Sequence, residues 1–276
     1  MKIGYALGGG VAYGFAHIGV LRALERHGIK PSAIAGTSVG AIIGGLYASG
    51  LTVEQIEEIA LNIKWSEIAK FVVPNEGLLD LAGLERFLLK HLLVKNVEDT
   101  PIKFSAVATD ITGATEIVYD KGPLEKAIHA SCCIPGIFVP MKNGKNIIVD
   151  GGVINNVPVS VVKNMGVDFI IGVDVTQKAI FDHKGKGDIF DILWRSMQLM
   201  MKENSALRGD ANDVNVDIMI APEVQGINPF DLSKKRELIK RGDEEIEKQI
   251  GIIMEKLENE KSILGKIKDI LTQKIL

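Results

Sequence analysis

The feature that most constrains the fold is a five-residue stretch, Gly36-Thr37-Ser38-Val39-Gly40, that lies between two apolar runs. The first run predicts a short strand and the second a helix, so this G-x-S-x-G pattern predicts a sharp strand–turn–helix elbow. Gly36 and Gly40 are expected where the crossing strand and helix leave no room for a Cβ. Ser38 would project from the turn in a strained conformation, at the positive helix end that stabilises a developing anion. A plain helix cap is the alternative interpretation of Ser38.

Length and charge limit the function classes. The chain has 276 residues, 46% of them hydrophobic, and a net charge of −3. This is enough for one large α/β core with a helical appendage, and it lacks the basic surface of a nucleic-acid-binding protein. The uncharged run over residues 39–51 is too short and too rich in glycine to span a bilayer. Nucleic acid is therefore not expected as a partner.

Two features bear on the compartment. Lys2 leads directly into an apolar strand pattern, without the longer apolar region and the cleavage site of a signal peptide. The two cysteines, Cys132 and Cys133, are adjacent, and neighbouring cysteines rarely form a disulfide, which indicates a reducing compartment. We predict a cytoplasmic protein, with peripheral contact at the inner membrane surface as an option.

Strand and helix patterns alternate along the chain, which predicts an α/β fold with a mostly parallel central sheet covered by helices on both faces. We expect a catalytic domain over residues 1–232 and a C-terminal helical extension over residues 233–276. Residues 65–97 are more apolar than one helix face requires. They indicate either a helix buried among others or a cap or lid whose apolar side lines an acyl pocket.

The extension carries an apolar row at alternating spacings of three and four residues, with lysines crowding the other faces. Three interpretations fit this row: a helix packed on its own domain, a coiled coil that forms a homodimer, or a helix on a membrane surface. The residues of the row are Ile246, Ile250, Ile253, Leu257, Leu264, Ile267 and Leu271.

Three segments follow apolar strand patterns and are expected to meet at the carboxyl end of the sheet: the loop after Leu7, the elbow, and Asp150. The glycine loop does not fit a dinucleotide fingerprint, because the third required glycine falls on Tyr13 and no acidic residue ends a strand about 20 residues later. A set of main-chain N–H groups aimed at the oxyanion of an acyl-transfer intermediate fits it better.

A nucleophilic serine needs a base. None of the histidines stands at a predicted strand end beside small residues, and each is interpreted as a surface or packing residue; they are His17, His27, His91, His129 and His183. Asp150 does end a strand, and Gly151 and Gly152 allow another segment to approach it closely. A direct Ser–Asp dyad with a strong anion hole is chemically sufficient, so no metal or other cofactor is predicted.

On these motifs the chain resembles the bacterial patatin-like phospholipases, from residue 3 to about residue 175. The matching segments are Leu7-Gly8-Gly9-Gly10, residues 14–21, Gly36-Thr37-Ser38-Val39-Gly40, Ala130-Ser131-Cys132 with Pro135, and Asp150-Gly151-Gly152 with Asn155-Asn156 and Pro158. The resemblance implies a three-layer α/β fold and hydrolysis of lipid acyl esters without a metal.

By motif, the resemblance makes Ser38 the nucleophile and Asp150 the base, and it assigns the oxyanion hole to Gly9, Gly10 and Val11. The elbow glycines and the Asp-Gly-Gly motif complete the expected site. We therefore predict a serine acyl hydrolase that cleaves phospholipid or other long-chain acyl esters through an acyl-enzyme.

Two residues depart from the family pattern. Val11 replaces a glycine and Tyr13 replaces an arginine or lysine, so the glycine loop loses both backbone freedom and a positive charge. Two alternative functions stay open: an acyltransferase of related fold, and a catalytically weakened adaptor protein.

Overall fold

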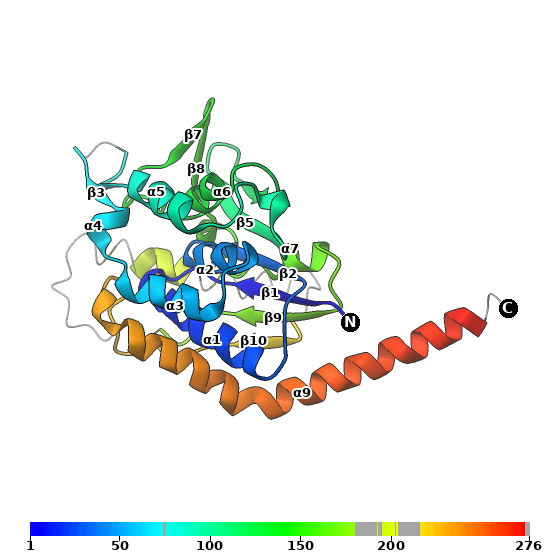
Figure 1. Cartoon of the computed structure of the whole chain (residues 1–276). Helices are drawn as coiled ribbons and strands as arrows, with labels where there is room; N and C mark the ends of the chain where they lie inside the picture. Colours follow the sequence, from blue (N-terminus) through cyan, green and yellow to red (C-terminus); the bar gives the residue numbers. More distant parts are fainter. Residues whose placement is uncertain (74–75, 180–191, 193–194, 202, 204–215, 274–276) are drawn as a thin grey trace.

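A mixed eight-stranded sheet runs through the centre of the structure (Figure 1). This computed structural model describes residues 1–73, 76–179, 192, 195–201, 203 and 216–273. The strand order is β10-β9-β1-β2-β5-β8-β7, and β6 pairs with the other side of β5. The strands are β1 (Ile3–Leu7), β2 (Ala33–Thr37), β5 (Lys103–Asp110), β6 (Thr115–Tyr119), β7 (Met141–Asn143), β8 (Asn146–Asp150), β9 (Phe169–Val173) and β10 (Ile218–Ile220).

The prediction of a mostly parallel sheet is confirmed. Strands β10, β9, β1, β2 and β5 run parallel to one another. The other three are antiparallel to their neighbours, because β6 returns from β5 and β7 forms a hairpin with β8. The sheet therefore has a parallel half and an antiparallel half, with β5 between them.

Helices cover both faces of the sheet, as predicted. Alternate strand residues such as Leu7 and Ile34 join the main core with α1 (Phe15–Arg26) and α2 (Val39–Ala48). Their neighbours in the strands pack instead with α7 (Val159–Asn164) in a second cluster on the opposite face. This is the period-two alternation expected of a strand that is buried on both sides. Two more helices, α3 (Val53–Asn62) and α6 (Leu124–Ser131), complete the core.

Residues 65–97 form a small substructure at one end of the sheet. It consists of α4 (Trp65–Ile68), the hairpin strands β3 (Lys70–Phe71) and β4 (Leu79–Asp80), and α5 (Ala82–His91). Leu81, Leu84 and Leu88 are buried, whereas β3 is exposed. The segment therefore contributes to the core on one side and faces solvent on the other.

Helix α9 (Lys235–Gln273) packs along α1 through its first half and then extends past the body of the molecule (Figure 1). Its residues up to Leu257 include five fully buried apolar side chains: Leu238, Ile239, Ile246, Ile253 and Leu257. The two helices touch at Gly19 and Gly242. A Cβ on Gly19 would lie 1.8 Å from the Ile239 carbonyl oxygen, and one on Gly242 would lie 2.0 Å from that of Ala16.

Ion pairs reinforce this contact, since Arg22 and Arg26 of α1 both reach Asp243 of α9. For the first half of α9, packing on its own domain is therefore the correct interpretation. No helix within the described ranges combines the length and the apolar character needed to cross a membrane.

Candidate active site

The elbow and the end of β8 meet head to head along one edge of β5. On that edge Thr37, the last residue of β2, pairs with Val107, and Asp150, the last residue of β8, pairs with Ala108. Because β2 runs parallel to β5 and β8 runs antiparallel to it, their carboxyl ends face each other. Asp150 therefore ends a strand close to Ser38, as expected, and the strand that carries it is antiparallel to β5.

Ser38 occupies a strained turn between β2 and α2. Its φ of 54° and ψ of −124° lie outside the regions that non-glycine residues favour. This is the backbone strain expected of a nucleophile elbow. The flanking glycines are required by close approach: a Cβ on Gly36 would lie 2.4 Å from the Gly40 carbonyl oxygen, and one on Gly40 would lie 2.1 Å from that of Leu7. The expected elbow geometry is thus present.

Asp150 is buried and contacts Ser38. Its Oδ1 accepts a hydrogen bond from the Gly152 N–H at 2.8 Å, and its carboxylate also interacts with the Ser38 hydroxyl. Burial raises the pKa of Asp150 from 3.8 to about 6, even though both hydrogen bonds favour the charged form. A carboxylate with this pKa is ionised at neutral pH and is a better proton acceptor than an exposed aspartate.

The glycine loop lies against the same two residues. Gly9, Gly10 and Val11 line a small cavity together with Ser38 and Asp150, which encloses about 440 Å³ when its open mouth is counted. The Gly9 N–H donates to the Asn156 carbonyl oxygen at 3.2 Å, so this amide is already bonded within the protein. Val11 has a φ of 52°, in the left-handed region that strains a β-branched residue.

Tyr13, the second departure from the family pattern, points into the core. It is 2% exposed, and its hydroxyl donates to the Ile227 carbonyl oxygen at 2.8 Å. Burial raises its pKa to about 12, so the side chain is neutral. Tyr13 therefore packs the loop onto the core instead of presenting a charge beside it.

Two buried side chains, Ser131 and His17, support the site through hydrogen bonds. Their residue types alone did not predict this role. The Ser131 Oγ accepts the Ser38 N–H at 2.8 Å and donates to the Val107 carbonyl oxygen at 2.5 Å. The His17 ring bonds the Gly8 carbonyl oxygen through Nε2 at 2.8 Å. Burial lowers the pKa of His17 to about 4, so this ring is neutral and Nε2–H is the donor.

Their places in the glycine-loop and Ala-Ser-Cys motifs were the available sequence signals for these two residues. Among the other histidines, His27 contacts Glu247 and His129 contacts Glu85, both away from Ser38. His183 lies outside the described residues.

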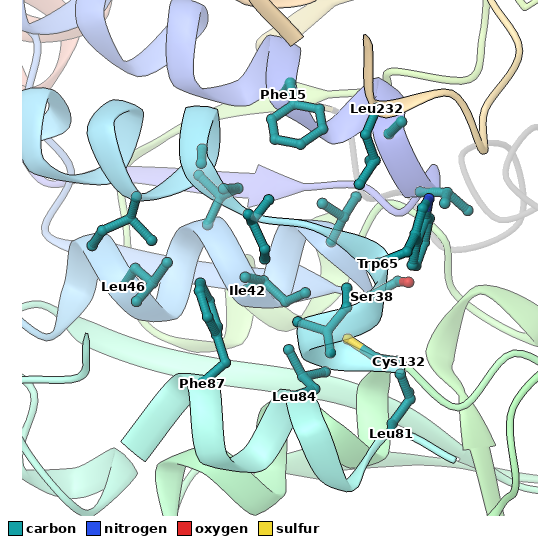
Figure 2. A pocket seen from close by; sticks show the side chains of 18 of the residues that line it. Phe15, Ser38, Ile42, Leu46, Trp65, Leu81, Leu84, Phe87, Cys132 and Leu232 are labelled. Atoms are coloured by element: carbon teal, nitrogen blue, oxygen red, sulfur yellow. The ribbon is translucent and has the colours of Figure 1, made fainter. Parts of the chain in front are cut away.

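A long apolar cavity begins at Ser38 and runs between α2, α3 and α5. It encloses about 830 Å³, counting its open mouth. Figure 2 shows Ser38 at one end beside Trp65 and Cys132, and Leu46 and Phe87 at the other. With about 1.5 Å of rise per residue in α2, the path from Ser38 to Leu46 spans about 12 Å. The remaining walls are Val11, Ala12, Phe15, Val39, Ile42, Ile43, Ile56, Ile59, Ala60, Ile63, Ile68, Leu81, Leu84, Ile134, Phe138 and Leu232.

The chain is similar to several known proteins. Residues 5–163 match the family model described as patatin-like phospholipase, which is more than half of the chain. An uncharacterised NTE family protein of Mycobacterium tuberculosis is 31% identical over 63% of this chain and 49% of its own length. Lysophospholipase NTE1 of Debaryomyces hansenii is 30% identical over 85% of this chain and 15% of its own.

Patatin-like phospholipase domain-containing protein 6 of Mus musculus is 31% identical over 71% of this chain and 15% of its own length. This chain therefore spans about half or less of the curated relatives it matches. Among solved structures, VipD of Legionella pneumophila matches 94% of this chain and 67% of its own, with a TM-score of 0.52 and 14% identity, which shows a shared fold. The chain belongs to the patatin-like phospholipase family.

Proposed function

We propose that this chain is a serine acyl hydrolase that cleaves carboxyl esters of lipids. The observation that carries the proposal is the position of Ser38: its hydroxyl contacts a buried carboxylate on one side and opens into a long apolar cavity on the other. A cavity lined by hydrocarbon side chains suits an acyl chain, because each buried CH₂ contributes about 0.8 kcal/mol.

In the acylation step, the Ser38 Oγ attacks the ester carbonyl carbon while its proton passes to Asp150. The tetrahedral intermediate collapses, the C–O bond to the alcohol breaks, and the alcohol leaves with the proton from Asp150. Water then attacks the acyl-enzyme and gives a proton to Asp150. The second tetrahedral intermediate collapses, the bond between the acyl carbon and the Ser38 Oγ breaks, Asp150 returns the proton to that Oγ, and the fatty acid leaves. One aspartate therefore serves as base and acid in turn.

The oxyanion in this scheme is held by main-chain donors. Because the Gly9 N–H already donates to Asn156, we assign the hole to the amides of Gly10 and Val11, with the N-terminus of α2 behind them. A donor of this kind typically lowers the barrier by about 2.7–4 kcal/mol. His17 and Ser131 position the loop and the elbow without touching the substrate.

The segment 65–97 serves in this proposal as a cap that supplies one wall of the acyl cavity, through Trp65, Leu84 and Phe87. Trp65 is fixed there because its ring N–H donates to the Phe230 carbonyl oxygen at 3.0 Å. The helical extension that begins after residue 232 lies outside the reacting atoms. It supports the cavity through Lys235, whose Nζ lies 5.7 Å from the ring centroid of the lining residue Phe15.

A fluorophosphonate probe tests the proposal directly. The wild-type chain should be labelled at Ser38 and should hydrolyse a soluble nitrophenyl ester, whereas Ser38→Ala should do neither. Ser49→Ala, which alters another buried serine, is the matched control and should keep both activities. A wild-type chain that takes no label would support the adaptor alternative. Faster turnover with an added acceptor alcohol or thiol, giving a new ester, would support the acyltransferase.

A further inference from the structure

Two exposed apolar side chains project from the cap. Phe71, in β3, and Val73, two residues later, are 89% and 88% exposed. Residues two apart in an extended segment point to the same side, so they form one apolar surface. Large apolar side chains gathered in this way mark an interaction surface more often than a free one.

These side chains belong to a segment that also lines the acyl cavity. β3 follows directly on α4, whose Trp65 and Ile68 line that cavity. Its hairpin partner β4 is joined to a second lining segment, since the Leu79 N–H donates to the carbonyl oxygen of Ile137, which lies between the lining residues Ile134 and Phe138. Phe71 and Val73 are therefore exposed on a hairpin that is attached to the cavity wall at both of its ends.

A second pair of exposed residues lies on the other side of Ser38. Met197 and Met201 line the small cavity beside Ser38 and Asp150, while Leu199 and Met200 between them are 65% and 59% exposed. In Figure 1 this yellow-green segment and β3 occupy the same end of the molecule, where the parallel strands end. We call Phe71, Val73, Leu199 and Met200 the rim patch.

Two lysines, Lys64 and Lys70, lie beside Phe71 and Val73 in the sequence. Of the acids in residues 64–80, Glu76 is paired with Lys142 and Asp80 accepts the Ala82 N–H, which leaves Glu67. Both lysines are exposed, and neither forms an ion pair with any residue that the structure describes. Lysines at the edge of an apolar patch are suited to lipid headgroups, with the apolar side chains reaching the acyl region below.

We infer that the rim patch docks on the surface of a lipid bilayer, with the mouth of the acyl cavity facing the membrane. The inference rests on the proposed function, because an ester packed in a bilayer must move its acyl chain into the cavity without crossing water. Docking at the rim gives that chain a continuous apolar path from the membrane to Ser38. The patch would then recognise the substrate surface, while the cavity recognises the chain.

The test compares co-sedimentation of the full chain with vesicles of phosphatidylcholine, with and without phosphatidylserine. The variant Phe71→Ser with Val73→Ser should bind both vesicles at least about tenfold less tightly than wild type, because two exposed apolar anchors are lost. Its turnover of a soluble nitrophenyl ester should be unchanged. Leu89→Ser with Leu93→Ser, which removes two equally apolar residues that are 59% and 61% exposed on and just after α5, is the matched control and should bind like wild type.

Lys64→Gln with Lys70→Gln should weaken binding to the phosphatidylserine vesicles more than to phosphatidylcholine alone, and added salt should remove the difference. Equal vesicle binding by the rim variant and wild type would overturn the inference, as would a wild-type chain that binds neither vesicle. A rim variant that dissociates a dimer in light scattering and keeps vesicle binding would show instead that the patch binds a second copy.

Failure of the proposed function gives a different result. If the chain is not a hydrolase, wild type turns over no ester, while loss of vesicle binding in the rim variant still establishes the docking surface. Ser38→Ala, which removes turnover, provides the same separation and should bind vesicles as wild type does.

Discussion

Replacing Asp150 with asparagine separates the role of this carboxylate in catalysis from its effect on the fold. Asparagine has the same shape, and its Oδ1 can still accept the Gly152 N–H. It cannot take the Ser38 proton, so kcat/KM for a soluble ester should fall by about 10²- to 10⁴-fold.

The same substitution should stabilise the folded chain in a pH-dependent way. A rise in the Asp150 pKa from 3.8 to about 6 means that the buried charge destabilises the folded state. At 1.36 kcal/mol per pKa unit, the full effect is about 3 kcal/mol. Below about pH 3 the carboxyl is protonated in both the folded and unfolded states, and no penalty exists. Above about pH 7 it is charged in both states, and wild type carries the whole penalty.

Urea unfolding of the two proteins across this pH range measures the effect. The stability advantage of Asp150→Asn should be smallest at about pH 3 and about 3 kcal/mol larger at about pH 8. Asp110→Asn, which alters another buried, turn-capping aspartate, is the control and should keep ester hydrolysis. In wild type, kcat/KM should fall as the pH drops through about 6, because the base becomes protonated. A stability difference that is the same at both ends of the range would refute the reasoning.

Three further outcomes are expected. Val11→Gly should raise the free energy of unfolding by about 1 kcal/mol in urea titrations, because φ of 52° no longer strains a β-branched residue; a decrease would mean that packing by Val11 matters more. Ser131→Ala should cost about 1–3 kcal/mol of stability and also lower kcat, since the Ser38 N–H loses its acceptor. The control variant Ser49→Ala should lower stability without lowering kcat. An equal loss of kcat in Ser131→Ala and Ser49→Ala would contradict the specific role of Ser131. Leu46→Trp should reduce turnover of long-chain esters about fourfold per excluded methylene relative to short-chain esters, whereas equal losses on both would place the acyl chain elsewhere.

The local geometry of the site could be predicted from sequence because it depends on short-range requirements. Gly36 and Gly40 are needed by the crossing strand and helix, and this need is visible in their spacing around Ser38. The direction of β8 was harder to predict. A signal was present in Asn143-Gly144, since a glycine with φ of 62° opens the two-residue turn of the β7–β8 hairpin.

Long-range supports could not be predicted in the same way. The roles of Ser131 and His17 depend on hydrogen bonds to Ser38 and Gly8 that only the folded sheet brings within reach. The apolar row of α9 posed a similar problem, because the same spacing of apolar residues fits a helix on its own domain, in a dimer or on a membrane. For its first half, the close approach of α1 and α9 at Gly19 and Gly242 distinguishes these options, together with the ion pairs to Asp243.

That contact also imposes an order on folding during synthesis, because its two helices lie far apart in the sequence. α1 carries His17, which holds the glycine loop, yet its partner α9 is made much later: Arg22 and Asp243 are 221 residues apart. While the ribosome is still adding the intervening residues, the outer face of α1 is uncovered and the backing of the loop is incomplete. A nascent chain therefore contains Ser38 and Asp150 before α9 is available to pack against the helix that carries His17.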